Sequence, residues 1–165
     1  MRVDYIIVGQ GLAGSLLYWE LQKQGTDVLV YDNPHYTKAS EVAAGLVNPV
    51  VFRRMTKTWL IDELFPQLKE TYDELEKELG IQLFYPLKIK KLLGEGEASF
   101  WKKKSIENDL KDYINPTPLN DKLKYINSPF GIGEVEKSGR VQVRTLMARL
   151  REKLIENDRD RKSVV

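Results

Sequence analysis

The hydrophobic pattern of the first 32 residues predicts a strand, a helix and a second strand. An apolar run of β-rich composition covers residues 3–8, and a second apolar run covers residues 28–31. Between them, residues 12–24 have a helix-like pattern that stops at Gly25, a residue that commonly ends helices. This order of elements predicts a βαβ unit of a parallel sheet.

A longer helix is predicted from residue 58 onward, where apolar residues recur at intervals of three or four. Pro66 should kink or split this helix, and Gly80 is a natural stop. Such a stripe is typical of a core-facing helix and not of a cofactor surface. The stripe consists of Leu60, Leu64, Leu68, Tyr72, Leu75 and Leu79.

The remaining pattern alternates short strands with two helices. Residues 83–93 are read as one or two strands, and residues 123–126, 133–137 and 140–143 as short strands. Helices are predicted over residues 98–113 and 144–157, the second with an apolar face of leucines. The charged tail, residues 158–162, is expected to be loose, and residues 163–165 to begin a strand.

The turn between the first strand and the first helix reads Gly9-Gln10-Gly11-Leu12-Ala13-Gly14, which fits G-x-G-x-x-G. Gly9 allows the sharp turn, Gly11 lets a pyrophosphate approach the backbone, and Gly14 lets the helix pack on the sheet. The helix N-terminus adds N–H groups and a partial positive charge. A strand before the turn and a helix after it favour a dinucleotide-binding turn over a chance match.

Asp32 lies at the tip of the second strand and is the predicted ribose-binding acid. Its carboxylate can accept hydrogen bonds from a pair of ribose hydroxyls. A negative charge at this position disfavours a 2′-phosphate, and therefore NADP. His35 follows closely and could lie near the adenine or ribose, although an exposed loop histidine is the preferred interpretation.

Composition narrows the function classes. The chain is 42% hydrophobic and 30% charged, as is typical of soluble globular proteins, and its net charge of +2 indicates neither a nucleic acid nor a membrane partner. No cysteine and one histidine are present, so neither a thiolate nor a zinc site is expected. No apolar run is long enough to span a bilayer, and no signal peptide is recognised, so a cytoplasmic location is expected.

A loop rich in small residues follows the acid and includes Ser40 and Ala43-Ala44-Gly45-Leu46. With the glycine turn and Asp32, it resembles the D-amino-acid-oxidase-like FAD-dependent oxidoreductases. In that family the loop runs along the FAD pyrophosphate and beside the flavin. The resemblance therefore implies FAD as cofactor, with contacts at Gly9, Gly11, Leu12, Ala13, Gly14, Asp32, Ser40, Ala44, Gly45 and Leu46.

The resemblance also implies an α/β fold with three parts. Residues 1–80 would be the N-terminal part of a Rossmann-type FAD-binding domain, and residues 81–143 the start of an antiparallel-sheet substrate domain. Residues 144–165 would return to the Rossmann domain. Family members are about twice as long, so the chain is expected to be truncated and, by itself, inactive. The family often has Val-Asp-Pro after a glycine before the last helix, whereas residues 139–143 read Gly-Arg-Val-Gln-Val.

The function implied by the resemblance is oxidation of an amine or amino acid, with hydride transfer from the C–N carbon to the flavin. No catalytic residue is indicated. Arg53 is the candidate for binding a substrate carboxylate through a bidentate contact, although a solvated basic turn explains it equally well. Two alternatives stay open: an NAD-dependent Rossmann oxidoreductase and a non-catalytic, truncated dinucleotide-binding module. The substrate, electron acceptor and oligomeric state are not indicated.

Overall fold

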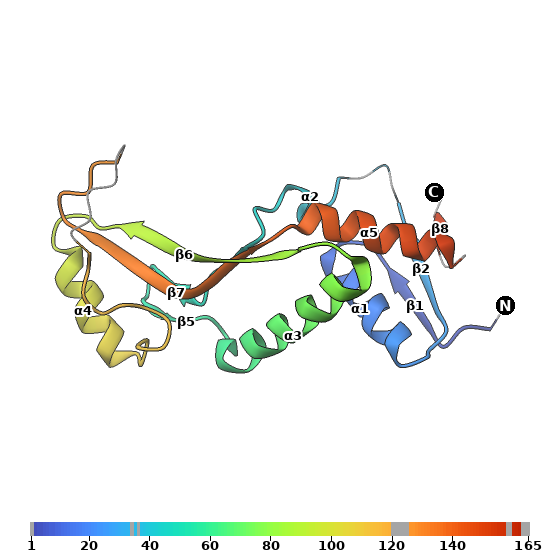
Figure 1. Cartoon of the computed structure of the whole chain (residues 1–165), viewed down its shortest axis with the longest axis horizontal. Coiled ribbons are helices and arrows are strands. Elements are labelled where there is room, and N and C mark those ends of the chain that lie inside the picture. Colours follow the sequence, from blue (N-terminus) through green and yellow to red (C-terminus); the bar gives the residue numbers. More distant parts are fainter. Residues whose placement is uncertain (1, 34, 36, 120–125, 158–159, 163–165) are drawn as a thin grey trace. The chain divides into compact units, whose positions relative to one another are not determined.

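The computed structural model describes residues 2–33, 35, 37–119, 126–157 and 160–162 (Figure 1). The chain divides into two compact units. The first unit comprises residues 1–45 and 142–165, and the second comprises residues 46–141. Residues 46–80, which the sequence analysis assigns to the Rossmann part, therefore pack within the second unit. The predicted domain limits at residues 80 and 143 concern functional domains and stay a prediction.

A parallel sheet with the strand order β1-β2-β8 forms the centre of the first unit. Strand β1 (Tyr5–Val8) pairs with β2 (Val28–Asp32), so that Tyr5 lies opposite Val28. Helix α1 (Leu12–Lys23) connects these two strands, which confirms the predicted βαβ unit. The core of this unit contains Ile7, Tyr18, Val28, Val30 and Leu154.

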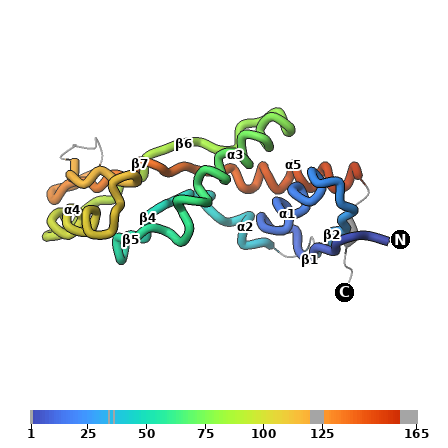
Figure 2. Tube along the Cα trace, turned by 90° about the horizontal axis from the view of Figure 1, so that it is seen from below, coloured from blue at the N-terminus to red at the C-terminus, as the bar shows by residue number. Residues whose placement is uncertain are grey.

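The end of the chain differs from the prediction. Helix α5 (Val143–Glu156) lies beside α1 (Figure 2). Strand β8 (Asp160–Lys162) follows it and pairs in parallel with β2. The expectation of a loose tail is therefore wrong for residues 160–162. Strand pairing uses backbone N–H and C=O groups, and charged residues are common on edge strands. Residues 163–165, where a strand was predicted to begin, lie outside the described residues.

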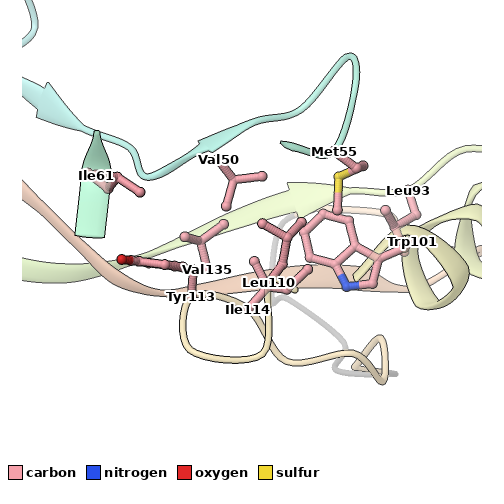
Figure 3. Packing of buried hydrophobic residues seen from close by; sticks show 9 residues of the cluster. All are labelled: Val50, Met55, Ile61, Leu93, Trp101, Leu110, Tyr113, Ile114 and Val135. Atoms are coloured by element: carbon pink, nitrogen blue, oxygen red, sulfur yellow. The ribbon is translucent and has the colours of Figure 1, made fainter. Parts of the chain in front are cut away.

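The second unit contains an antiparallel sheet with the order β3-β7-β6. It consists of β3 (Leu46–Val47), β6 (Phe84–Leu92) and β7 (Ile132–Val141), and a small hairpin joins β4 (Val50–Val51) to β5 (Thr56–Lys57). Strand β7 is continuous where two short strands were predicted. The core packs apolar residues from the hairpin, β7 and the segments around helix α4 (Glu97–Glu107) (Figure 3).

Helix α3 (Ile61–Leu79) also belongs to the second unit and runs through Pro66 without being split. Proline removes the hydrogen bond to the carbonyl four residues earlier, here that of Asp62 in the first turn. The helix ends at Gly80, whose φ of 64° gives the left-handed cap that the sequence predicts. Among the described residues, no helix is both long and apolar enough to cross a membrane.

Candidate functional site

The glycine turn joins β1 to α1, and two of its glycines are required by the fold itself. Gly9 has a φ of +96°, a conformation that side chains other than glycine rarely adopt. A Cβ atom added to Gly14 would lie 2.0 Å from the carbonyl oxygen of Gly9, which no side chain could tolerate. Gly14 therefore permits the close packing of α1 on the turn, as predicted for this motif.

Gly11 is different, because the described residues give no structural reason for a glycine there. Its φ of −79° and ψ of −173° are ordinary extended values. An added Cβ would meet only Ser40 Oγ, at 3.5 Å, which is normal van der Waals contact. The space above Gly11 thus fits the close approach of an external group such as a pyrophosphate.

The loop that was predicted to contact the cofactor reaches the start of α1 through Ser40. The backbone N–H of Leu12 donates a hydrogen bond to Ser40 Oγ at 3.1 Å. Ser40 lies in the short helix α2 (Ala39–Val42), so this bond brings α2 to the N-terminus of α1. The first N–H groups of any helix have no intrahelical acceptor, and here a hydroxyl satisfies one of them.

The other predicted contact residues are placed less tightly. Ala13 and Ala44 are exposed, and Gly45 has a φ of +69°. Leu46, in β3, is 54% exposed and belongs to the second unit. Their contact with a cofactor stays a prediction.

Asp32 is buried and already has three polar partners. Its side chain is 5% exposed. Oδ1 accepts a hydrogen bond from the Gln10 backbone N–H at 2.9 Å. Oδ2 lies 2.9 Å from Lys38 Nζ and 3.3 Å from Arg151 Nη1. Two cations therefore stand at the oxygen that a ribose hydroxyl would approach, and the predicted ribose contact requires the flexible Lys38 side chain to move.

The pKa of Asp32 is lowered below its ordinary value of 3.8. Burial alone would raise it, because a charged carboxylate loses hydration. The hydrogen bond from the Gln10 amide and the charges of Lys38 and Arg151 outweigh burial. Asp32 is therefore an anion at neutral pH, as the predicted role in ribose binding requires.

A pocket of about 400 Å³ lies in the first unit beside these residues. Its lining combines cationic side chains and the carboxylate of Glu41 with apolar side chains. The lining includes Gln10, Lys38, Val42, Arg144, Met147 and Arg151. No sequence motif predicted a contact for these side chains. Lys38 lies only six residues after Asp32, so the sequence could have suggested it as a partner. Nothing in the local sequence pairs Arg151 with Asp32.

Arg53 lies in the second unit and is exposed, which is compatible with substrate binding but does not test it. His35 is also exposed, in agreement with the preferred interpretation, and its backbone N–H donates to Asn33 Oδ1 at 3.0 Å. In the described part of the chain, no group of three or more metal-binding side chains comes together.

Fold and site together define a βαβ unit with a glycine-rich turn after its first strand and a buried acid at the end of its second strand. A family model described as FAD dependent oxidoreductase matches residues 4–157. The chain therefore belongs to this family, which confirms the predicted family and its cofactor, FAD. The NAD-dependent alternative is not supported.

Solved structures show the same fold. L-Amino acid deaminase from Proteus myxofaciens superposes with a TM-score of 0.67 and 16% identity, over 98% of this chain and 38% of that chain. Glycine oxidase from Bacillus cereus ATCC 14579 gives a TM-score of 0.68 and 17% identity, over 98% and 47%. The chain is also 38% identical to the uncharacterized oxidoreductase YurR of Bacillus subtilis (strain 168) over 56 residues, or 34% of this chain and 15% of YurR. It spans less than half the length of each.

Proposed function

We propose that this chain supplies the dinucleotide-binding part of an FAD-dependent enzyme that oxidises an amine or amino acid. The observation that carries the proposal is the glycine at position 11, which neither the backbone conformation nor the packing among the described residues requires, because an added Cβ would meet only Ser40 Oγ at 3.5 Å. Family membership supports FAD as the group that uses this space. When bound, FAD supplies the acceptor for the hydride.

Different residues of the chain would then bind different parts of FAD. Gly9 and Gly14 would shape the turn, and the N–H groups of Gly11 and of Ala13, at the N-terminus of α1, would bind the pyrophosphate. The N–H of Leu12 already donates to Ser40 Oγ, so Leu12 would bind the pyrophosphate only if that hydrogen bond opens. Asp32 holds the ribose. Ser40 positions the loop that continues through Ala44, Gly45 and Leu46 toward the flavin.

An amino-acid substrate is supported by the activities named for proteins of the same fold, which include a glycine oxidase, an L-amino acid deaminase and an iminodiacetate oxidase. Each of these acts on a compound that carries a carboxylate. Arg53 remains our candidate for binding that carboxylate, because a guanidinium can make two parallel hydrogen bonds to it.

The cofactor proposal is tested by titrating the 165-residue chain with FAD and, in parallel, with NAD, following flavin fluorescence and calorimetric heat. We expect weak, saturable binding of FAD and no binding of NAD. Gly11→Val should abolish it and preserve the far-UV circular dichroism spectrum, since the added side chain enters the pyrophosphate space. Gly94→Val is the matched control, because an added Cβ there also meets only ordinary contacts, from Glu97, and lies in the second unit.

Two results would count against the proposal. Full FAD binding by Gly11→Val would show that the turn is not the phosphate site. No binding of FAD by the wild-type chain, with its secondary structure intact, would favour the non-catalytic alternative.

The substrate proposal is tested in a form of the protein that oxidises amino acids. Arg53→Ala should raise KM by roughly tenfold or more, the effect of losing a charge-assisted hydrogen bond, and should leave flavin loading unchanged. Arg54→Ala, at the neighbouring exposed arginine, is the control. Unchanged kinetics for every amino acid turned over would remove Arg53 from the site.

A further inference from the structure

Arg151 ties helix α5 to both elements of the cofactor site. Its Nη1 donates a short hydrogen bond to Gln10 Oε1 in the glycine turn and lies 3.3 Å from Asp32 Oδ2 at the end of β2. Gln10 in turn donates its backbone N–H to Asp32 Oδ1 at 2.9 Å. The three residues therefore form a closed ring of polar contacts that joins α5, the turn and β2.

We propose that Arg151 is a positioning residue of the FAD site, which holds the Gln10 turn and the Asp32 carboxylate in the geometry that binds the dinucleotide. The inference rests on the proposed function and deepens it, because it makes binding by the N-terminal βαβ unit depend on a helix 119 residues further along the chain than Asp32.

The chemistry of the ring suits an arginine. The planar guanidinium presents several N–H donors in a fixed arrangement, so one side chain can serve an amide oxygen and a carboxylate together. Gln10 is 3% exposed, and its Oε1 faces the guanidinium. Its Nε2 is buried without an acceptor among the described residues. Without Arg151, Oε1 would also lose its donor, and the carboxamide would no longer have a fixed orientation beside the turn.

The helix itself does not depend on Arg151 for its position. Leu146, Leu150 and Leu154 lie on its buried face, each with 0% exposure, and Leu154 belongs to the core that contains Val28 and Val30. Arg151 is 26% exposed along its side chain. Loss of the guanidinium should therefore disturb the turn and the acid before it disturbs the packing of the helix.

A substitution of Lys38 tests the effect of positive charge near Asp32 apart from the positioning by Arg151. It lies 2.9 Å from Asp32 Oδ2 and 3.9 Å from Glu41 Oε1, so it supplies positive charge to the same oxygen from a different element. The charged groups that face Asp32 are thus Lys38, from the loop before α2, and Arg151, from α5. Lys38→Met removes one charge and leaves the ring of Arg151, Gln10 and Asp32 intact.

The experiment measures FAD dissociation constants of the 165-residue chain at about pH 7 and about pH 4, the lower value lying close to the ordinary pKa of Asp32, 3.8. Arg151→Met should weaken FAD by about tenfold or more, the effect of losing a charge-assisted hydrogen bond. The loss should be greater at the lower pH, because burial then opposes ionisation of Asp32 with less compensation. Arg151→Lys, which keeps the positive charge, should recover the part of the loss in FAD affinity that appears only at the lower pH.

Two further variants make the test specific. Arg149→Met, in an exposed pair with Glu152 on the same helix, should bind FAD as the wild type does. Gln10→Ala combined with Arg151→Met should weaken FAD by less than the product of the two single effects, because both residues act through one ring.

Wild-type affinity in Arg151→Met at both pH values would overturn the inference and leave the proposed function standing. Equal losses in Arg151→Met, Arg151→Lys and Arg149→Met, independent of pH, would overturn it in favour of general damage to α5. No FAD binding by the wild type would overturn the proposed function itself, and this inference with it.

Discussion

At the scale of single residues, two of the three glycines of the turn are required by the fold itself. Gly9 is required by its backbone conformation, and Gly14 by the carbonyl of Gly9 against which it packs. Gly11 is required by neither. The motif predicted the roles of Gly9 and Gly14, because both follow from the geometry of a strand that turns sharply into a helix. The role that it assigns to Gly11, room for a pyrophosphate, stays a prediction.

Stability measurements should separate these roles. Gly14→Ala forces its Cβ to within 2.0 Å of a backbone oxygen, so α1 or the turn must shift. We expect a loss of about 1–3 kcal/mol in the free energy of unfolding, the usual cost of overpacking. Gly11→Ala should fold with unchanged or slightly higher stability, since alanine restricts the unfolded chain. Urea unfolding followed by circular dichroism measures both, and equal destabilisation of the two variants would contradict this account.

The residues that the motif did not predict are the partners of the acid. The ribose-binding role of Asp32 was read from its place at the end of a strand, which is local information. Its ion pairs with Lys38 and Arg151 depend on how a loop and a distant helix return to that strand end. Charged residues on a helix are usually solvated, so no sequence pattern distinguishes Arg151 from its exposed neighbour Arg149.

The lowered pKa of Asp32 makes a prediction for stability against pH. A carboxyl group whose folded pKa lies below its unfolded value contributes stability above the unfolded value, here 3.8, and loses it as the pH falls through the folded pKa. Asp32→Asn should therefore cost about 1–3 kcal/mol at neutral pH, where its cationic partners lose their counter-charge. The difference from wild type should shrink below pH 3.8. Asp73→Asn, at an exposed site on α3, is the control for acid titration, and a gap that stays constant through this range would contradict the assignment.

At the scale of elements, the sequence predicted best where the pattern is local. The strands and helix of the βαβ unit follow from residues 3–32 alone. Strand β7 was predicted in two pieces because Ser138-Gly139 has the composition of a turn. In the structure, Gly139 lies within the strand, where its missing side chain leaves room for the ring of Phe84 on β6. A glycine inside a strand can mark such a close approach, and only the partner strand reveals it.

The packing of Phe84 on Gly139 is testable by a pair of substitutions. A Cβ atom at Gly139 would lie 2.4 Å from two atoms of the Phe84 ring and 3.1 Å from the Tyr85 carbonyl oxygen. Gly139→Ala should therefore destabilise the second unit by about 1–3 kcal/mol. The double variant Gly139→Ala, Phe84→Leu should recover part of this loss beyond additivity, because the smaller side chain makes room. Strictly additive effects in urea unfolding would show that the ring is not the obstacle.

At the scale of the whole molecule, the chain brings distant segments into one unit. Residues 1–45 join residues 142–165, while residues 46–141 form a unit with its own sheet and core. The sequence analysis predicted that the last helix returns to the Rossmann part, which this grouping contains. The division between residues 45 and 46 was not predicted, because a helical stripe of apolar residues does not show which part of the chain packs on it. In the structure Tyr72 and Leu75 are buried, whereas Leu60 and Leu64 are exposed.

This division predicts where FAD changes hydrogen exchange. A ligand that binds only the folded first unit raises the free energy of opening that unit by RT ln(1 + [L]/Kd), which is about 2.7 kcal/mol at a hundredfold excess over Kd. Amides of Gln10, Leu12 and Arg151 should therefore exchange more slowly with FAD. Those of Leu110 and Ile114, in the core of the second unit, should keep their rates, because compact units can open independently. In Gly11→Val, FAD should change neither set. Equal slowing in both sets would show that the two units open as one cooperative body, and that the cofactor site draws on the stability of the whole chain.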